Sequence, residues 1–145
     1  MKAFRHTGIV IFDLDKELHF YRDLLGLRIV KDEVETGPYI DAVLDTKGTR
    51  VRTIKMEADT GGLLELLWFG SHLTKREDQS APYDPGLSHI AFTVSDLNSV
   101  YNRLRVKGVC FNSEPMLSTG GFAKVAFCRD PEGNLVELVE EITKK

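Results

Sequence analysis

The hydrophobic and polar positions of the chain follow the same pattern twice. Each copy begins with a segment rich in β-branched and apolar residues, at 5–11 and at 88–94, which predicts a strand. A segment with apolar residues at helical spacing follows in both copies, and Gly26 and Gly108 predict the ends of the two helices. Repetition of this kind predicts two structurally equivalent modules.

Further strands are predicted after each helix. They fall at 27–34, 39–45, 50–57 and 62–69 in the first copy, and at 109–112, 122–128 and 134–140 in the second. The polar stretch 70–87 is longer than most connections inside a compact domain, and it contains two prolines. We therefore expect one domain over 1–145, built from a module at about 4–69, a linker at about 70–87 and a module at about 88–141.

The repeat also places one His and one Glu at matching positions in each copy. His6 and His89 lie on the first predicted strands, and each copy closes on a Gly-x-Leu-[Leu/Val]-Glu-Leu-[Leu/Val] pattern that contains Glu65 or Glu137. Alternation puts each Glu on the apolar face of its strand, where a carboxylate is costly unless it is paired or bound to a metal. Taken singly, a strand His or Glu is more often structural, but the repeat correlates all four.

Two imidazoles and two carboxylates form a donor set whose charge balances a divalent cation. With positions left for water, such a set suits Ni, Co, Mn or Fe(II), and Zn is also compatible with it. The sequence therefore predicts one divalent metal ion held by His6, Glu65, His89 and Glu137.

Composition narrows the class of protein. The 145 residues include 19 Lys and Arg against 22 Asp and Glu, a net charge of −3 without a basic stripe, so nucleic acid is not an expected partner. Apolar runs are far shorter than the ~20 residues of a membrane span, and the N-terminus lacks the apolar core of a signal peptide. We expect a cytoplasmic globular protein, with Cys110 and Cys128 as reduced, partly buried thiols.

Four stretches of the chain resemble the vicinal oxygen chelate superfamily, which includes glyoxalase I, methylmalonyl-CoA epimerase, extradiol dioxygenases and antibiotic-resistance proteins. They are His6-Thr-Gly-Ile-Val, the helix segment from Asp13 to Leu27, Gly86-Leu-Ser-His-Ile-Ala-Phe92 and Asp130-Pro-Glu-Gly-Asn-Leu-Val-Glu-Leu138. The resemblance implies an α+β fold in which two paired βαβββ modules form a curled mixed sheet around a metal-binding cavity. It also implies a homodimer.

By this resemblance, the protein is a metal-dependent lyase or isomerase of the glyoxalase I type that acts on a small carbonyl compound through a metal-stabilised enolate or ene-diolate. Similarity to glyoxalase I makes Glu137 the first choice for the catalytic base and Glu65 the second. Two positions depart from glyoxalase I: Val10 stands where an Arg usually grips glutathione, and Phe69 where an Asn is usual.

The resemblance also keeps other functions open. A 2-methylacyl-CoA epimerase is the first alternative, with an acyl-CoA substrate and with Asp41 as the nearest match to that branch's separate acidic base. A metal-free ligand-binding or resistance protein is the second, and a dioxygenase is a minor reading because its acid/base His and Tyr have no counterpart here. Asp41, Phe69 and Lys124 are the candidate substrate contacts.

Overall fold

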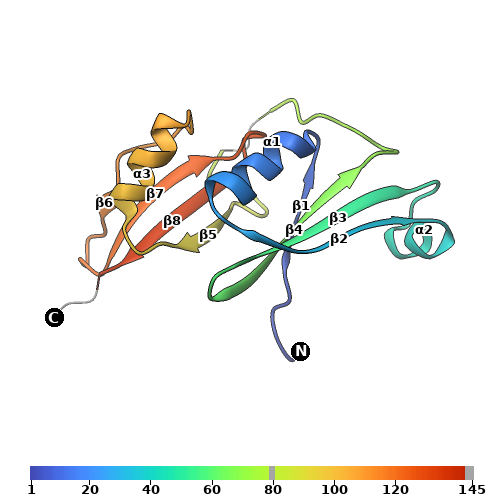
Figure 1. The fold of residues 1–145 in the computed structure, drawn as a ribbon, viewed down its shortest axis with the longest axis horizontal. Helices are drawn as coiled ribbons and strands as arrows, with labels where there is room; N and C mark the ends of the chain where they lie inside the picture. The colour runs from blue at the N-terminus through green and yellow to red at the C-terminus, as the bar shows by residue number, and fades with distance from the viewer. Residues whose placement is uncertain (79–80, 143–145) are drawn as a thin grey trace. The chain divides into compact units, whose positions relative to one another are not determined.

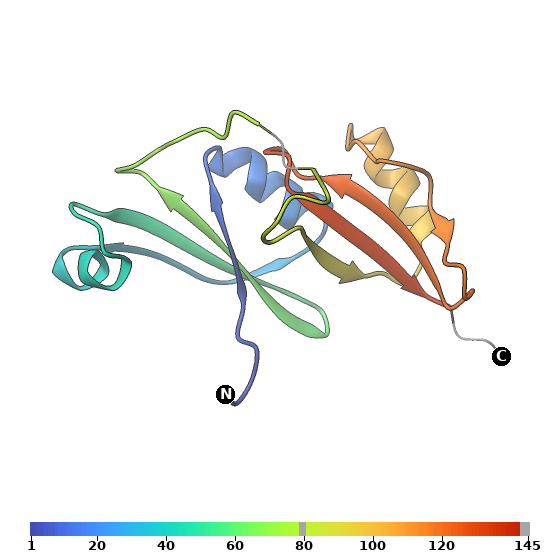
Figure 2. The same ribbon diagram turned by 180° about the vertical axis from the view of Figure 1, so that it is seen from behind.

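The structure is a computed structural model that describes residues 1–78 and 81–142. The chain divides into two compact units, Met1–Arg76 and Glu77–Lys145. Each unit contains one four-stranded mixed sheet with a crossover helix between its first and second strands, as Figures 1 and 2 show from opposite sides. The second unit has the order β-α-β-β-β, and the first adds one more helix between its second and third strands. The expected α+β class and the two βαβββ modules are therefore confirmed, and neither sheet is closed into a barrel.

The sheet of the first unit has the order β1-β4-β3-β2. Its strands are β1 (Thr7–Ile11), β2 (Arg28–Thr36), β3 (Arg50–Ala58) and β4 (Gly61–Phe69). β1 pairs parallel with β4, whereas β4–β3 and β3–β2 are antiparallel. The crossover from β1 to β2 runs through a helix, and this topology brings the start of the chain beside the last strand of the unit.

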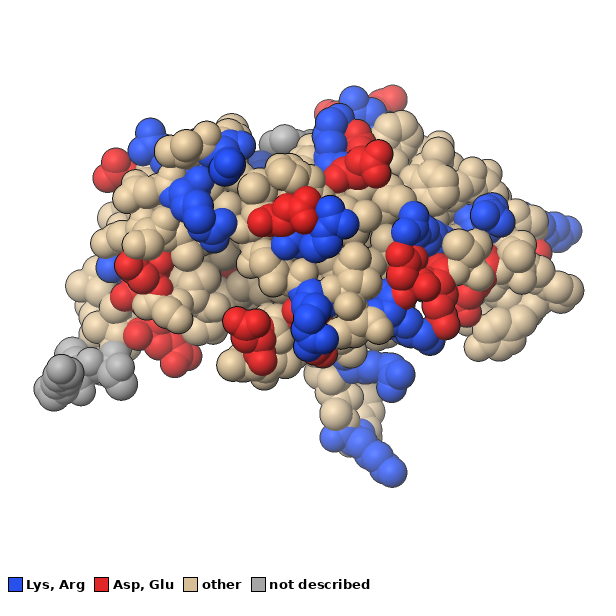
Figure 3. Space-filling model, in the orientation of Figure 1, with Lys and Arg blue, Asp and Glu red and all other residues tan. Residues whose placement is uncertain are grey.

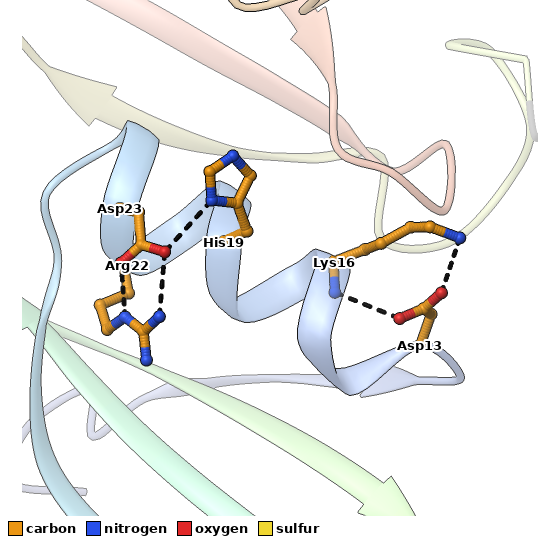
Figure 4. Close-up of polar contacts among 5 residues, drawn as sticks. All are labelled: Asp13, Lys16, His19, Arg22 and Asp23. Atoms are coloured by element: carbon orange, nitrogen blue, oxygen red, sulfur yellow. Dashed lines mark hydrogen bonds and ion pairs between the residues drawn. The ribbon is translucent and has the colours of Figure 1, made fainter.

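That crossover helix has two parts, α1 (Leu14–Leu18) and the π-helical turn η1 (His19–Leu24). Asp13 caps the N-terminus by accepting a hydrogen bond from the Lys16 backbone N–H, and its side chain also pairs with the Lys16 ammonium (Figure 4). His19 is exposed and pairs with Asp23. Hydrogen bonds from Arg22 and then from His19 lower the pKa of Asp23 to about 2.

The second unit repeats this arrangement with the sheet order β5-β8-β7-β6. Its elements are β5 (His89–Thr93), α3 (Leu97–Val106), β6 (Met116–Leu117), β7 (Ala123–Arg129) and β8 (Leu135–Glu141). Asp96 caps α3 as Asp13 caps α1, and it accepts hydrogen bonds from the backbone N–H and hydroxyl of Ser99. Gly26 and Gly108 follow the two helices with φ of 83° and 87°, a conformation that glycine adopts without strain.

Alternation along the strands gives each sheet a buried face and a face that carries the predicted site residues. Ile54, Met56 and Leu66 are fully buried on one face of the first sheet. In the second sheet Val136 and Leu138 occupy the equivalent face, which α3 covers. Glu65 and Glu137 lie one residue out of step with these positions, so both carboxylates belong to the opposite face, called here the site face.

Two predicted strands are wrong. Residues 39–45 form helix α2 (Pro38–Leu44) instead, because Pro38 fits the first turn of a helix, where its missing N–H needs no partner. In 109–112 only Phe111 makes an isolated bridge, to Cys128, and the edge strand β6 lies further along the chain. Ordered pairing with β7 therefore begins only after the turn that follows Phe111.

The surface charge follows the nearly balanced composition. On the face shown in Figure 3, acidic and basic side chains are interspersed over both units. Among the described residues, no helix has the length and apolar character to cross a membrane.

Candidate metal centre

The first half-site consists of His6 and Glu65. His6 directly precedes β1, and the parallel pairing of β1 with β4 sets Gly8 beside Glu65. His6 Nε2 therefore comes within 3.1 Å of Glu65 Oε2. The Glu65 side chain is only 11% exposed, so its carboxylate is held where an unpaired charge is costly.

The second half-site consists of His89 and Glu137 and repeats this geometry. His89 is the first residue of β5, and the parallel pairing of β5 with β8 sets Ala91 beside Glu137. The distance between His89 Nε2 and Glu137 Oε2 is again 3.1 Å. Each unit thus joins the His and the Glu that the sequence repeat singled out.

The geometry of each half-site fits two adjacent ligands of one metal ion. Bonds of about 2.1 Å at a right angle place two ligand atoms roughly 3.0 Å apart, close to the 3.1 Å between the imidazole and carboxylate atoms of each pair. A hydrogen bond between the two groups has a similar length. The chemistry of the donors, neutral imidazole and carboxylate, suits a divalent ion.

His6 Nδ1 is buried and has no hydrogen-bond partner among the described residues, so the first half-site lacks the second contact that usually fixes the ring of a metal-binding His. One local feature of this half-site does fit a metal. A side chain at Gly8 would have its Cβ 3.1 Å from Leu67 Cδ1 and 3.8 Å from Glu65 Oε2, so glycine keeps the space beside the carboxylate open. Within the described parts of the chain, no group of three or more His, Cys, Asp or Glu side chains is arranged for metal binding. Each half-site by itself brings together two of the four candidate ligands.

The second half-site has a supporting residue that the sequence analysis missed. Ser88 Oγ lies 2.6 Å from His89 Nδ1, and a hydroxyl that accepts from Nδ1–H leaves Nε2 free to bind a metal. The Phe127 ring packs edge-on against the imidazole with 5.2 Å between the ring centroids. The only signal in the sequence is a hydroxyl residue directly before the His, a common arrangement.

Replacing Ser88 by Ala is expected to weaken metal binding by roughly 10-fold, because the His89 ring loses the partner that fixes its tautomer and orientation. The chain offers a matched control, since Ser71 Oγ makes a similar 2.7 Å contact with Nδ1 of His72, in the segment between the modules. Isothermal titration calorimetry with Zn(II) should show the loss in Ser88→Ala and not in Ser71→Ala. Equal affinities in all three proteins would refute the role given to Ser88.

The contacts of Asp41 are with residues close to it in the chain. It lies in α2 and not on a central strand, and its carboxylate accepts hydrogen bonds from the backbone N–H groups of Gly48 and Thr49 at 2.9 and 2.8 Å. Hydrogen bonding by Thr49 and then by Gly48 lowers the pKa of Asp41. Through these hydrogen bonds the Asp41 carboxylate holds the turn between α2 and β3.

We therefore expect Asp41→Ala to lower the unfolding midpoint at pH 7 and to leave metal affinity unchanged. The depressed pKa means that Asp41 contributes stability above the unfolded-state pKa of about 3.9, and this contribution is lost as the pH falls through the folded-state pKa. The difference in midpoint between variant and wild type should shrink on acidification. Thermal unfolding followed by circular dichroism at several pH values measures this difference. A loss of metal binding in Asp41→Ala would contradict the structural role given to Asp41.

The other two candidate contacts lie on different faces of their sheets. Phe69 is on the site face of β4, two positions beyond Leu67 and four beyond Glu65. Lys124 pairs with Glu140 at 3.4 Å and lies on the face of β7 that α3 covers, opposite the face of Glu137. Phe69 therefore shares a face with Glu65, whereas Lys124 does not share a face with Glu137.

The two cysteines are free thiols in different surroundings. Cys110 is exposed, which differs from the partly buried position expected for it, and Cys128 is fully buried. Burial raises the pKa of the Cys128 thiol to about 12, so this thiol stays protonated at neutral pH.

Comparison with known proteins places these half-sites in context. The sequence model of the Glyoxalase/Bleomycin resistance protein/Dioxygenase superfamily matches residues 3–138. YurT of Bacillus subtilis is 33% identical over 135 residues, which cover 93% of this chain and 96% of that protein. A probable lactoylglutathione lyase of Synechocystis is 30% identical over 142 residues, which cover 97% of this chain and 96% of that protein.

Among solved structures, a glyoxalase family protein from Bacillus cereus superposes with a TM-score of 0.89 and 22% identity. The match covers 99% of this chain and 96% of the Bacillus cereus chain. At this level of identity, the likeness establishes the fold.

Proposed function

Because the chain belongs to the Glyoxalase/Bleomycin resistance protein/Dioxygenase superfamily, we propose that it is a divalent-metal-dependent lyase or isomerase of the glyoxalase I type. Its substrate is a small carbonyl compound. The observation that carries this proposal is the repeated half-site, in which a His Nε2 and a Glu Oε2 lie 3.1 Å apart in each unit. The proposal requires two such pairs to share one metal ion.

The donor set favours a first-row divalent ion. His6, His89, Glu65 and Glu137 together supply two nitrogen and two oxygen ligands, which suit Ni, Co, Mn or Fe(II) and also accept Zn. When bound, the ion acts as a Lewis acid that polarises a substrate carbonyl and makes the neighbouring C–H more acidic. The name of the Synechocystis relative, a probable lactoylglutathione lyase, supports this type of chemistry.

Glu137 is the residue proposed to move the proton. Its Oε2 contacts His89, whereas its Oε1 has no hydrogen-bond or ion-pair partner among the described residues. The side chain is 21% exposed, against 11% for Glu65. A carboxylate that is held through one oxygen can take a proton from a substrate carbon with the other and return it to the adjacent carbon. Glu65 has contacts on both oxygens and serves as a fixed ligand.

The surroundings of the first half-site favour an apolar substrate group. Val10 is paired in register with Leu67, and Leu67 and Phe69 share the site face with Glu65. Val10 is 65% exposed, so an apolar surface continues along the strand from the carboxylate. This surface offers no cation at the position where glyoxalase I usually carries an Arg, so the substrate is proposed to be smaller or less charged than a glutathione adduct.

The test is an assay of the metal-loaded protein on three substrates, with an apo sample as control. They are the hemithioacetal of methylglyoxal with a small uncharged thiol, the hemithioacetal of methylglyoxal with glutathione, and methylmalonyl-CoA. We expect metal-dependent turnover that is faster with the small hemithioacetal than with the glutathione adduct. Turnover of methylmalonyl-CoA alone would move the protein to the epimerases, and a protein that binds no metal would be a binding or resistance protein.

A further inference from the structure

The two half-sites differ at one equivalent position of the repeat. The register of the first sheet places Lys55 of β3 opposite Glu65 of β4, and the register of the second sheet places Phe127 of β7 opposite Glu137 of β8. A cation therefore faces one ligand carboxylate where an aromatic ring faces the other. The repeat makes this a controlled comparison, because the His and Glu geometry is the same on both sides.

Lys55 contacts the Glu65 carboxylate directly. Its Nζ lies 3.3 Å from Glu65 Oε1, and His6 Nε2 approaches the other oxygen, Oε2. The Lys55 side chain is 22% exposed, so the ion pair is only weakly screened by solvent. The register neighbour Lys31 pairs with Glu33, which leaves Lys55 as the cation whose contact with Glu65 the structure describes.

We propose that Lys55 is a positioning residue that holds Glu65 in place and competes with the metal ion for its charge. This inference rests on the proposed function. Without metal, the ammonium is the partner that a largely buried carboxylate requires. With metal bound, two cations share Glu65, and each lowers the affinity of the carboxylate for the other. The repulsion between an ammonium and a divalent ion exceeds the contribution that one orienting hydrogen bond makes to metal binding. The net effect of Lys55 is therefore to lower the affinity of Glu65 for the metal ion.

The competition has a consequence for the reaction. A carboxylate that shares its charge with an ammonium donates less of it to a metal ion, and an ion that receives less charge polarises a substrate carbonyl more strongly. Lys55 thus lowers the affinity of Glu65 for the metal ion and raises the reactivity of the ion once it is bound. Phe127 exerts no such effect, so Glu137 keeps its full charge as the base and Glu65 stays fixed by two contacts.

The test compares Lys55→Gln and Lys55→Met, which both remove the charge, with Lys55→Arg, which keeps it. Lys124→Gln is the matched control, because Lys124 makes a 3.4 Å ion pair of similar exposure with Glu140 on the opposite face of the other sheet. Zn(II) affinity is measured by competition calorimetry on apo protein, the unfolding midpoint by circular dichroism, and kcat on the metal-saturated enzyme.

We expect both neutral variants to bind Zn(II) at least ~10-fold more tightly than wild type, because they lack the repulsion between the ammonium and the metal ion. They should also unfold at a lower temperature without metal and have a lower kcat. Lys55→Arg should match wild type, and Lys124→Gln should lose stability without any change in metal affinity. A merely structural Lys55 would not produce tighter binding together with lower stability. Unchanged or weaker Zn(II) binding in the neutral variants overturns the inference, whereas a wild type that binds no metal overturns the proposed function and this inference together.

Discussion

Replacing Glu137 by Gln is expected to lower kcat by at least ~10²-fold, the usual contribution of a general base. The amide keeps the shape of the side chain and an oxygen that can remain near His89, but it cannot take a proton from a substrate carbon at neutral pH. Metal should bind more weakly through the remaining three ligands and the amide oxygen, so the assay is run at a saturating metal concentration. Steady-state kinetics on the metal-saturated variant, with the metal content measured in the same sample, provides the check.

Glu140→Gln is the control for this variant. Glu140 lies on the same strand but on the face covered by α3, where it accepts a hydrogen bond from the Leu97 backbone N–H and pairs with Lys124. Its amide variant should lose stability and keep its kcat. Near-normal turnover by Glu137→Gln would move the role of base to another residue, with Glu65 as the first to examine.

Removing the metal is expected to abolish turnover to a similar or greater extent. A Lewis acid contributes several kcal/mol of transition-state stabilisation, which corresponds to a loss of at least about 10²-fold when it is absent. Dialysis against a chelator should produce the inactive apo protein, and stoichiometric addition of Ni(II), Co(II), Mn(II) or Zn(II) should restore activity. The circular dichroism spectrum should stay nearly constant, because both sheets have cores of their own. Full activity in a protein shown to be metal-free would contradict the proposed reaction.

Much of the fold follows from local patterns in the chain. Strand alternation and helical spacing located β1, β3, β4, β7 and β8 to within a few residues, and the repeat indicated that both units share one topology. Segment 39–45 was predicted wrongly because its short apolar pattern suits a strand as well as a helix. Pro38, directly before this segment, is the first residue of α2.

The candidate ligands were predictable because they repeat, whereas the residues that tune them were not. His6 and Glu65 stand at the same places in their copy as His89 and Glu137, and the structure joins each pair at 3.1 Å. The contacts of Lys55 with Glu65 and of Phe127 with His89 depend on the register between strands, which periodicity alone does not give. The partners of Asp41 were not predictable either, because they come from a turn seven and eight residues further along the chain.

The central claim is that one His and one Glu from each repeat together bind a single ion. Its most direct test is the metal stoichiometry of wild type, His6→Ala and His89→Ala, measured by mass spectrometry of the metal after equilibration with Zn(II) and gel filtration. The account predicts one ion per chain in wild type and a large loss in each variant, because either substitution removes one of four shared ligands. Two ions per chain in wild type, or a full equivalent retained in both variants, would contradict it.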